Sequence, residues 1–299
     1  MSARSGNLKN AMQSAAKDVE DTLELLLPKG PAPEAHLFAA MRYAALGGGK
    51  RLRPFLTIQC GRLFDVNPDQ LNLVAAALEC VHVYSLIHDD LPAMDNDDLR
   101  HGRATVHRAF DEATAILAGD ALLTFAFGLL VRSDTHADPF VRCELTARLA
   151  AAAGARGMVG GQMIDLRAGT YAHTIETVTR LQRLKTGALI VCACEAGALV
   201  AKASPRALSA LNGYAHELGL AFQITDDLLD VSGDDALMGK AARKDGGAGK
   251  ATVVEILGVE RARDQAKRVA AQAARHLDIF DERADLLRAV AEFAVERDH

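Results

Sequence analysis

The chain has no tryptophan, and aromatic residues make up only 5% of its 299 residues. Its formal net charge is −5. The sequence also lacks the basic stripe with interleaved aromatics that is typical of nucleic-acid binding. We therefore expect no nucleic-acid partner. An anionic ligand would have to be held locally, by metal ions and a few basic side chains.

Cysteine is scarce as well, with five residues in the chain. They lie in apolar stretches and not at metal-ligand spacing, and their odd number argues against a disulfide framework. We expect small buried side chains at all five positions. These are Cys60, Cys80, Cys143, Cys192 and Cys194.

Long apolar runs and boundary signals are also missing. No run reaches the length of a membrane span, and residues 1–7 lack a signal-peptide core, so we expect a soluble, cytoplasmic protein with no membrane span. No Pro/Ser-rich linker, low-complexity tract or internal repeat divides the chain. Residues 1–299 are therefore interpreted as a single domain.

What the chain does contain is helical periodicity. Hydrophobic residues make up 49% of it, and they recur at three- and four-residue spacing while strand-like alternation is nearly absent. The predicted helices are 8–27, 33–46, 52–65, 70–91, 111–132, 139–154, 157–168, 174–203, 205–231, 251–256, 259–276 and 281–296. This pattern predicts an all-α bundle of roughly ten or more helices, with loops at its two ends.

Two groups of aspartates stand at the ends of apolar helices. The first group is Asp89, Asp90 and Asp95, and the second contains Asp226 and Asp230. Asp226 and Asp230 share one helix face, and Pro92 interrupts the helix so that Asp95 can turn back toward the same site. An acidic run alone is usually solvated surface. Two such groups favour a site for hard cations, Mg²⁺ or Mn²⁺, and hence a phosphorylated substrate.

Basic residues accompany the acids. The glycine turn at residues 47–49 is followed by Lys50, Arg51 and Arg53, which suits a diphosphate at a helix start, although a helix junction with solvated charges is the alternative. It is not a Walker loop. Further cations follow both acidic groups, and their placement indicates one shared anion site. They are Arg100, His101 and Arg103, and Lys240, Lys244 and Lys250.

Three other polar features interrupt apolar helices. His82 lies two turns before Asp89 on the same face, so it is either a cavity residue or a buried structural histidine. The sequence Lys185-Thr186-Gly187 predicts a kink that exposes carbonyl groups, because glycine costs about 1 kcal/mol in a helix. Gln162 and Asp165 form a polar pair that lines the cavity or makes an internal hydrogen bond.

Five segments together resemble the trans-prenyl diphosphate synthase family, and most closely its bacterial farnesyl diphosphate synthases. They are residues 48–54, 87–95, 160–166, 185–187 and 222–230. The resemblance implies a helical bundle around a deep central cavity, of the isoprenoid synthase type. It also implies a homodimer that condenses isopentenyl diphosphate with dimethylallyl or geranyl diphosphate.

The resemblance assigns roles to individual residues. Asp89 and Asp95 would bind Mg²⁺ from one wall and Asp226 from the other, with Asp90 and Asp230 assisting and about three ions bound in all. The allylic diphosphate would be held by Arg100, Lys185 and Lys240, with Thr186 and Gln223 near the reacting carbons. Isopentenyl diphosphate would be held by Lys50, Arg53 and His82, with His101 nearby. The catalytic set is Asp89, Asp90, Asp95, Arg100, Lys185 and Asp226.

Product length follows from helix geometry. The growing tail should run from Asp89 toward the helix N-terminus, where one turn of about 5 Å matches one isoprene unit. Ser85 lies one turn below Asp89, and the ring of neighbouring Tyr84 would close the tunnel, which predicts a C15 product. An aromatic residue five positions before the motif also agrees with the family pattern.

The chain departs from the family in two places. Arg100-His101-Gly102 stands where Arg-Arg-Gly is usual, and histidine lacks the fixed donor fork of arginine. We therefore predict that His101→Arg lowers the KM for isopentenyl diphosphate. Residues 250–254 lack the usual Tyr-Pro after the threonine.

Other functions remain open at this stage. A class I terpene cyclase would need more aromatic residues than this chain has, and a non-catalytic synthase subunit would have lost an aspartate group. Within the favoured class, geranylgeranyl or geranyl diphosphate synthase stays possible, because one or two side chains set the length.

Overall fold

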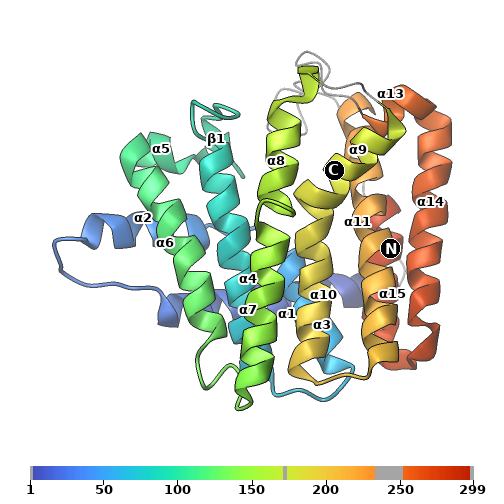
Figure 1. Ribbon diagram of the computed structural model, residues 1–299, viewed down its shortest axis with the longest axis horizontal. Helices are drawn as coiled ribbons and strands as arrows, with labels where there is room; N and C mark the ends of the chain where they lie inside the picture. The colour runs from blue at the N-terminus through green and yellow to red at the C-terminus, as the bar shows by residue number, and fades with distance from the viewer. Residues whose placement is uncertain (1–2, 171–173, 233–251, 297–299) are drawn as a thin grey trace.

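The computed structural model describes residues 3–170, 174–232 and 252–296, and it is a bundle of α-helices. Figure 1 shows the long helices side by side, with β1, α5 and α13 at one end of the bundle. The all-α prediction is confirmed. The α-helices of eight or more residues are α1 (Ala3–Leu26), α2 (Ala35–Ala45), α3 (Leu52–Arg62), α4 (Pro68–Asp89), α6 (Glu112–Leu130), α7 (Pro139–Ala153), α8 (Met158–Leu166), α9 (Ile175–Gln182), α10 (Ala188–Val200), α11 (Pro205–Ser232), α14 (Val259–His276) and α15 (Asp285–Glu296).

The short elements differ most from the sequence prediction. Between α4 and α6 lie a hairpin of two strands, β1 (Leu99–Arg100) and β2 (Arg103–Ala104), and the four-residue helix α5 (Val106–Ala109). The predicted helix 174–203 is divided by η2 (Arg183–Gly187), a π-helical turn. The remaining short elements are η1 (Ala168–Thr170), α13 (Val253–Leu257), η3 (Leu277–Ile279) and η4 (Glu282–Ala284).

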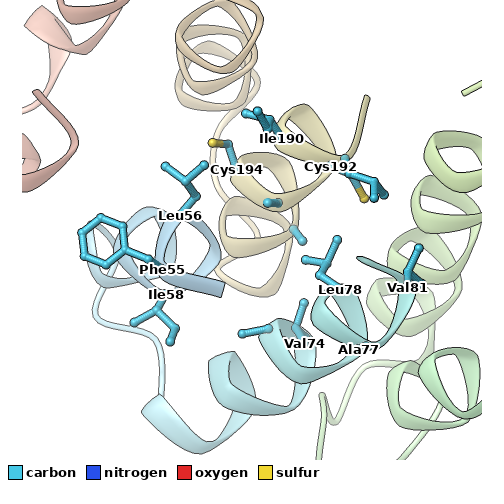
Figure 2. Close-up of a cluster of buried hydrophobic side chains, with 14 of the residues drawn as sticks. Phe55, Leu56, Ile58, Val74, Ala77, Leu78, Val81, Ile190, Cys192 and Cys194 are labelled. Atoms are coloured by element: carbon cyan, nitrogen blue, oxygen red, sulfur yellow. The ribbon is translucent and has the colours of Figure 1, made fainter. Parts of the chain in front are cut away.

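The centre of the core lies where α3, α4 and α10 meet, as Figure 2 shows. Phe55, Leu78 and Cys194 come from these three helices and are almost completely buried. Each large apolar side chain buried in this way contributes about 1.5–3 kcal/mol. Small residues let the helices approach closely, and a Cβ atom on Gly197 would lie only 2.3 Å from the Thr57 carbonyl oxygen. The low aromatic content is thus compatible with a dense core.

Two expectations from composition need correction. Four cysteines are buried, but Cys143 is exposed on α7; all five are free thiols. The expectation that no apolar stretch has membrane-span length was wrong for α4 and α6, which are both long and apolar enough. In α4 this composition reflects a core helix, because 72% of its apolar window is buried inside the bundle. The corresponding share in α6 is 39%.

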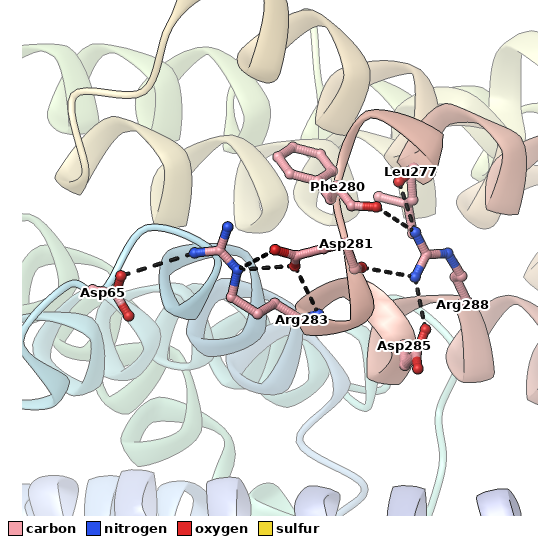
Figure 3. A network of polar contacts seen from close by, with 7 residues as sticks. All are labelled: Asp65, Leu277, Phe280, Asp281, Arg283, Asp285 and Arg288. Carbon is pink, nitrogen blue, oxygen red and sulfur yellow. Dashed lines mark hydrogen bonds and ion pairs between the residues drawn. The ribbon is translucent and has the colours of Figure 1, made fainter.

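A polar network closes the C-terminal part of the fold (Figure 3). Arg288 on α15 donates to the carbonyl oxygens of Leu277, Phe280 and Asp281, at 2.9, 2.9 and 3.0 Å. These carbonyls follow the end of α14, in the short turns that lead into α15. One guanidinium therefore fixes the turn by which α15 folds back onto the bundle.

Candidate active site

Two cavities share one wall inside the bundle. We call the larger one, of about 600 Å³, the polar cavity; it is bordered by the glycine turn, the β1–β2 hairpin and parts of α4 and α11. The apolar cavity, of about 370 Å³, lies between α4, α8 and η2. Arg53, His82, Leu86 and Thr186 line both, so the two cavities meet at these side chains.

The first aspartate group lies where α4 ends. The Asp95 amide donates to the Asp89 carbonyl at 2.9 Å, and the Asp97 amide donates to the Asp90 carbonyl at 3.2 Å. These bonds turn the chain back on itself after Pro92, as the sequence indicated. Asp89 and Asp95 are partly exposed, whereas the Asp90 residue is only 3% exposed.

The Asp90 carboxylate is engaged by Arg100. Arg100 Nε lies 2.8 Å from Asp90 Oδ1 and 2.9 Å from Oδ2, and Nη2 donates to Oδ1. Such a two-pronged pair fixes the guanidinium in direction as well as position. We had expected Asp90 to assist in binding a metal ion. The contact with Arg100 instead favours a role in holding the Arg100 guanidinium in place.

Asp89 faces a cation from across the cavity. The pKa of its carboxyl is raised to about 6, mainly by burial and to a smaller extent by the neighbouring carboxylates of Asp95 and Asp90. The charges of Lys185 and Arg100 oppose this shift. Asp89 and Lys185 both line the apolar cavity, and they come from different helices. The end of α4 and the η2 turn therefore enclose the same space.

The π-helical turn supplies the facing wall. Lys185 donates to Asp165 on α8. Gln162 and Asp165, which the sequence suggested as a pair, therefore have different roles, and Asp165 holds the lysine. A Cβ atom on Gly161 would lie 2.2 Å from the Lys185 amide nitrogen. Only glycine allows α8 to approach the turn this closely. The interruption predicted at residues 185–187 is thus present, packed tightly against α8.

Thr186 is oriented by a chain of hydrogen bonds. It donates to Gln223 Oε1 at 3.0 Å, and Gln223 Nε2 donates to Asp227 Oδ1 at 3.2 Å. The other Asp227 oxygen accepts from Gln182 Nε2 and from the Val253 amide, both at 3.0 Å. Asp227, which the sequence analysis left without a role, ties α9, α11 and α13 together. The sequence feature that could have revealed this role is the four-residue spacing between Gln223 and Asp227.

Asp226 on α11 lines the polar cavity. The side chain of Asp230 and the residues Lys240, Lys244 and Lys250 lie outside what the structure describes. Among residues 3–170, 174–232 and 252–296, no three His, Cys, Asp or Glu side chains are grouped as a ready-made metal cage. The carboxylates at the two walls nevertheless fit a hard divalent cation that takes its remaining ligands from phosphate oxygens and water.

The glycine turn places Lys50, Arg51 and Arg53 beside the polar cavity, but Arg51 is committed to a buried partner. Arg53 carries a buried Nε that has no hydrogen-bond partner within the part of the chain that the structure describes. Arg51 has a left-handed φ of 46° and turns inward, where it pairs with buried Glu79 and donates to the Ala45 carbonyl. Arg51 therefore anchors the turn instead of serving as a surface cation.

His82 points into both cavities, in agreement with its spacing from Asp89. Burial holds its pKa well below the usual value, and the nearby guanidinium groups of Arg53 and Arg51 lower it further. The imidazole is thus neutral near pH 7 and can donate or accept one hydrogen bond without adding charge.

The apolar cavity is bordered by aromatic and flexible side chains. Tyr84 is 6% exposed, and its ring meets His88 edge to face, with centroids 5.6 Å apart. Ser85 lines the same space and donates to the His82 carbonyl at 2.8 Å. Gln162 is buried here, and neither of its side-chain polar atoms has a partner within the described residues.

Comparison with known proteins agrees with this geometry. The sequence matches the polyprenyl synthetase family over residues 34–292. It is 43% identical to the farnesyl diphosphate synthase of Escherichia coli (strain K12), over 96% of this chain and 97% of that protein. It is 38% identical to the geranylgeranyl diphosphate synthase of Cyanophora paradoxa, over 98% and 97%. A crystal structure of an FPP/GFPP synthase from Zymomonas mobilis superposes with a TM-score of 0.91 at 48% identity, covering 97% of this chain and 100% of that one.

A helical bundle in which acidic and basic side chains face two joined cavities, together with these likenesses, defines a short-chain trans-prenyltransferase. The chain belongs to the polyprenyl synthetase family. The resemblance and the fold class inferred from the sequence are thereby confirmed.

Proposed function

We propose that the protein is a farnesyl diphosphate synthase, which condenses isopentenyl diphosphate with dimethylallyl and then geranyl diphosphate. The observation that carries the proposal is the position of Tyr84, buried beside the apolar cavity little more than one turn before Asp89. A prenyl tail that starts near Asp89 and extends toward the N-terminus of α4 meets this ring early. The farnesyl diphosphate synthase of Escherichia coli is among the relatives that support a C15 product.

The two joined cavities suit the first chemical step, since Arg100 lines the polar cavity and Lys185 lines the apolar cavity. Ionisation of the allylic carbon–oxygen bond leaves a diphosphate with increased negative charge, which Arg100 and Lys185 are placed to stabilise. The carbocation is formed beside the apolar cavity, where Thr186 and Gln223 offer oriented dipoles and the other walls exclude water. No protein nucleophile is required.

The second step needs isopentenyl diphosphate to bind next to the carbocation, on the side of the glycine turn. Lys50, Arg53, His82 and His101 line the polar cavity there and are proposed to hold its diphosphate. Its double bond attacks the carbocation, and the released allylic diphosphate accepts the proton that is lost. The shared wall at Arg53, His82 and Thr186 brings the two substrates together.

Magnesium is the proposed cofactor, as is general for this family. Asp89 and Asp95 on one wall and Asp226 on the other would hold the ions, with the count of three an inference from the family. When bound, Mg²⁺ supplies Lewis-acid stabilisation of the leaving diphosphate.

We also propose that the protein is a homodimer and that α6 forms part of its interface. Ile116 and Leu117 on this helix are 44% and 56% exposed, although the helix is among the most apolar in the described chain. A second copy that packs against this face would remove these side chains from water.

Product analysis tests the proposal directly. The protein is incubated with Mg²⁺, isopentenyl diphosphate and, in separate reactions, dimethylallyl, geranyl or farnesyl diphosphate. We expect farnesyl diphosphate from the first two starters and no extension of the third. Accumulation of C20 or C10 product would contradict the farnesyl assignment, and hydrocarbon release without isopentenyl diphosphate would indicate a cyclase.

A further inference from the structure

The β1–β2 hairpin carries a second arginine that faces the polar cavity. Arg100 and Arg103 are directly opposite each other in the antiparallel register, so their side chains share one face of the hairpin. The two-residue turn between them, His101-Gly102, has φ angles of 50° and 75° and reverses the chain tightly. Both arginines line the polar cavity.

These two arginines differ in their partners. Arg100 is committed to Asp90, as described above. Arg103 makes no ion pair with any carboxylate within residues 3–170, 174–232 and 252–296. Its guanidinium lies over the ring of Tyr43, with Cζ 4.2 Å from the ring centroid. Stacking of this kind orients the planar fork and leaves its in-plane donors directed outward.

The surroundings of Arg103 form a built cradle. Tyr43 donates its hydroxyl to the Ala104 carbonyl at 2.8 Å, which fixes β2 against α2 directly beside Arg103. A Cβ atom on Gly47 would lie 2.8 Å from Arg103 Nη1, so the glycine turn leaves room for the guanidinium. Arg103 thus stands beside the turn that carries Lys50 and Arg53 into the same cavity.

We propose that Arg103 binds the diphosphate of isopentenyl diphosphate and supplies the guanidinium fork that His101 cannot. The family usually has Arg-Arg-Gly where this chain has Arg100-His101-Gly102, so one arginine is missing from this side of the cavity. The hairpin provides a replacement two residues later, held by Tyr43. Arg103 is therefore a substrate-binding residue for isopentenyl diphosphate, and the inference rests on the proposed function.

The central test compares Arg103→Met with Arg108→Met. Arg108 is on the same segment, but it is paired with Asp98 and does not line the cavity, so it controls for loss of charge. In Arg103→Met we expect the KM for isopentenyl diphosphate to rise about tenfold or more, because a charged hydrogen-bond donor is lost. The KM for geranyl diphosphate and kcat at saturation should stay near wild type, and Arg108→Met should change neither KM.

Two further variants separate substrate binding from structural damage. Introducing His101→Arg into Arg103→Met should restore most of the affinity for isopentenyl diphosphate, which a merely structural role of Arg103 would not explain. Tyr43→Phe keeps the ring but loses the hydroxyl bond to Ala104, so it should raise the KM for isopentenyl diphosphate less than Tyr43→Leu, which loses both. Melting temperatures of all variants check that the fold is intact.

The inference is overturned if Arg103→Met leaves the KM for isopentenyl diphosphate unchanged, or if the KM for geranyl diphosphate rises instead. It is also overturned if His101→Arg gives no recovery in that background. The wild-type protein reports separately on the proposed function: if it forms no condensation product, the enzyme assignment itself fails, whatever the variants do.

Discussion

The guanidinium of Arg100 meets both carboxylate oxygens of Asp90, with Nε–Oδ distances of 2.8 and 2.9 Å. Asp90 begins the turn after α4, and Arg100 ends the first strand of the hairpin, so this pair clamps the whole acidic segment between them. The clamp determines where Arg100 presents its remaining donors to the polar cavity.

Replacement of Arg100 by lysine should therefore impair binding and turnover of the allylic substrate. Lysine retains the charge but cannot form the two-pronged contact, so we expect kcat/KM for geranyl diphosphate to fall about 10- to 100-fold. The KM for isopentenyl diphosphate should change much less. Arg108→Lys, at an exposed ion pair, is the control in the same steady-state assays. Equal losses for both variants would contradict the role of the clamp.

Asp89→Asn should increase stability while it abolishes activity. The folded carboxyl has a pKa of about 6 against an ordinary value of 3.8, so the folded state holds the extra proton between these values. The contribution of this carboxyl to the free energy of unfolding consequently falls as pH rises from about 4 to 6, and it remains unfavourable at pH 7. Without metal at pH 7, the variant should be more stable by about 1 kcal/mol, a figure reduced for solvent screening.

Thermal unfolding with EDTA at pH 3.5 and pH 7 checks this prediction. The two proteins should converge at the lower pH, where both side chains are neutral. Addition of Mg²⁺ and diphosphate at pH 7 should stabilise the wild type more than the variant. A variant less stable than wild type at pH 7 without metal would be inconsistent with an unfavourable buried charge.

Tyr84→Ala should lengthen the product. Loss of the ring extends the apolar cavity along α4, so we expect C20 or longer products from the same substrates. Tyr84→Phe retains the ring and should still stop at C15, which makes it the matched control. Chromatography of dephosphorylated products distinguishes the outcomes, and C15 alone from the alanine variant would show that another residue closes the tunnel.

The double variant Ile116→Asp/Leu117→Asp should be monomeric. Two charges on the exposed face of α6 would be desolvated in a dimer and would repel their symmetry mates. Leu25→Asp, at a 76% exposed position on α1, should leave the oligomer intact. Light scattering after size-exclusion chromatography measures both. A double variant with the mass of the wild-type oligomer would place the interface elsewhere.

The sequence predicted the helical architecture because apolar periodicity alone specifies which faces are buried. It also predicted that the residues around Asp89 and Lys185 face a common space, and in the structure both line the apolar cavity. The orientation of Arg51 was not predictable, since it depends on a left-handed backbone and on Glu79, 28 positions away. Arg103 was taken only as one of several nearby cations, because its distinguishing feature, the ring of Tyr43, comes from a distant helix.

The roles of Asp165 and Asp227 show the same limit. Asp165 accepts from Lys185 of η2, and Asp227 accepts from Gln182 of α9, so spacing along one helix does not reveal these partners. Only the contact between Gln223 and Asp227 follows that spacing. Local patterns identify which side chains face inward. They do not tell which of these hold the others in place.

The π-helical turn at Arg183–Gly187 determines how the site would respond to the loss of one residue from the protein chain. A π turn contains about one residue more than a regular turn. Deleting a single residue there would join α9 and α10 into one regular α-helix and keep both helices in their present phase, so the change would be confined to the turn itself. Within the turn, the side chains of Lys185 and Thr186 would be displaced from Asp165 and Gln223. An indel of one residue at this position therefore separates helix formation from catalysis.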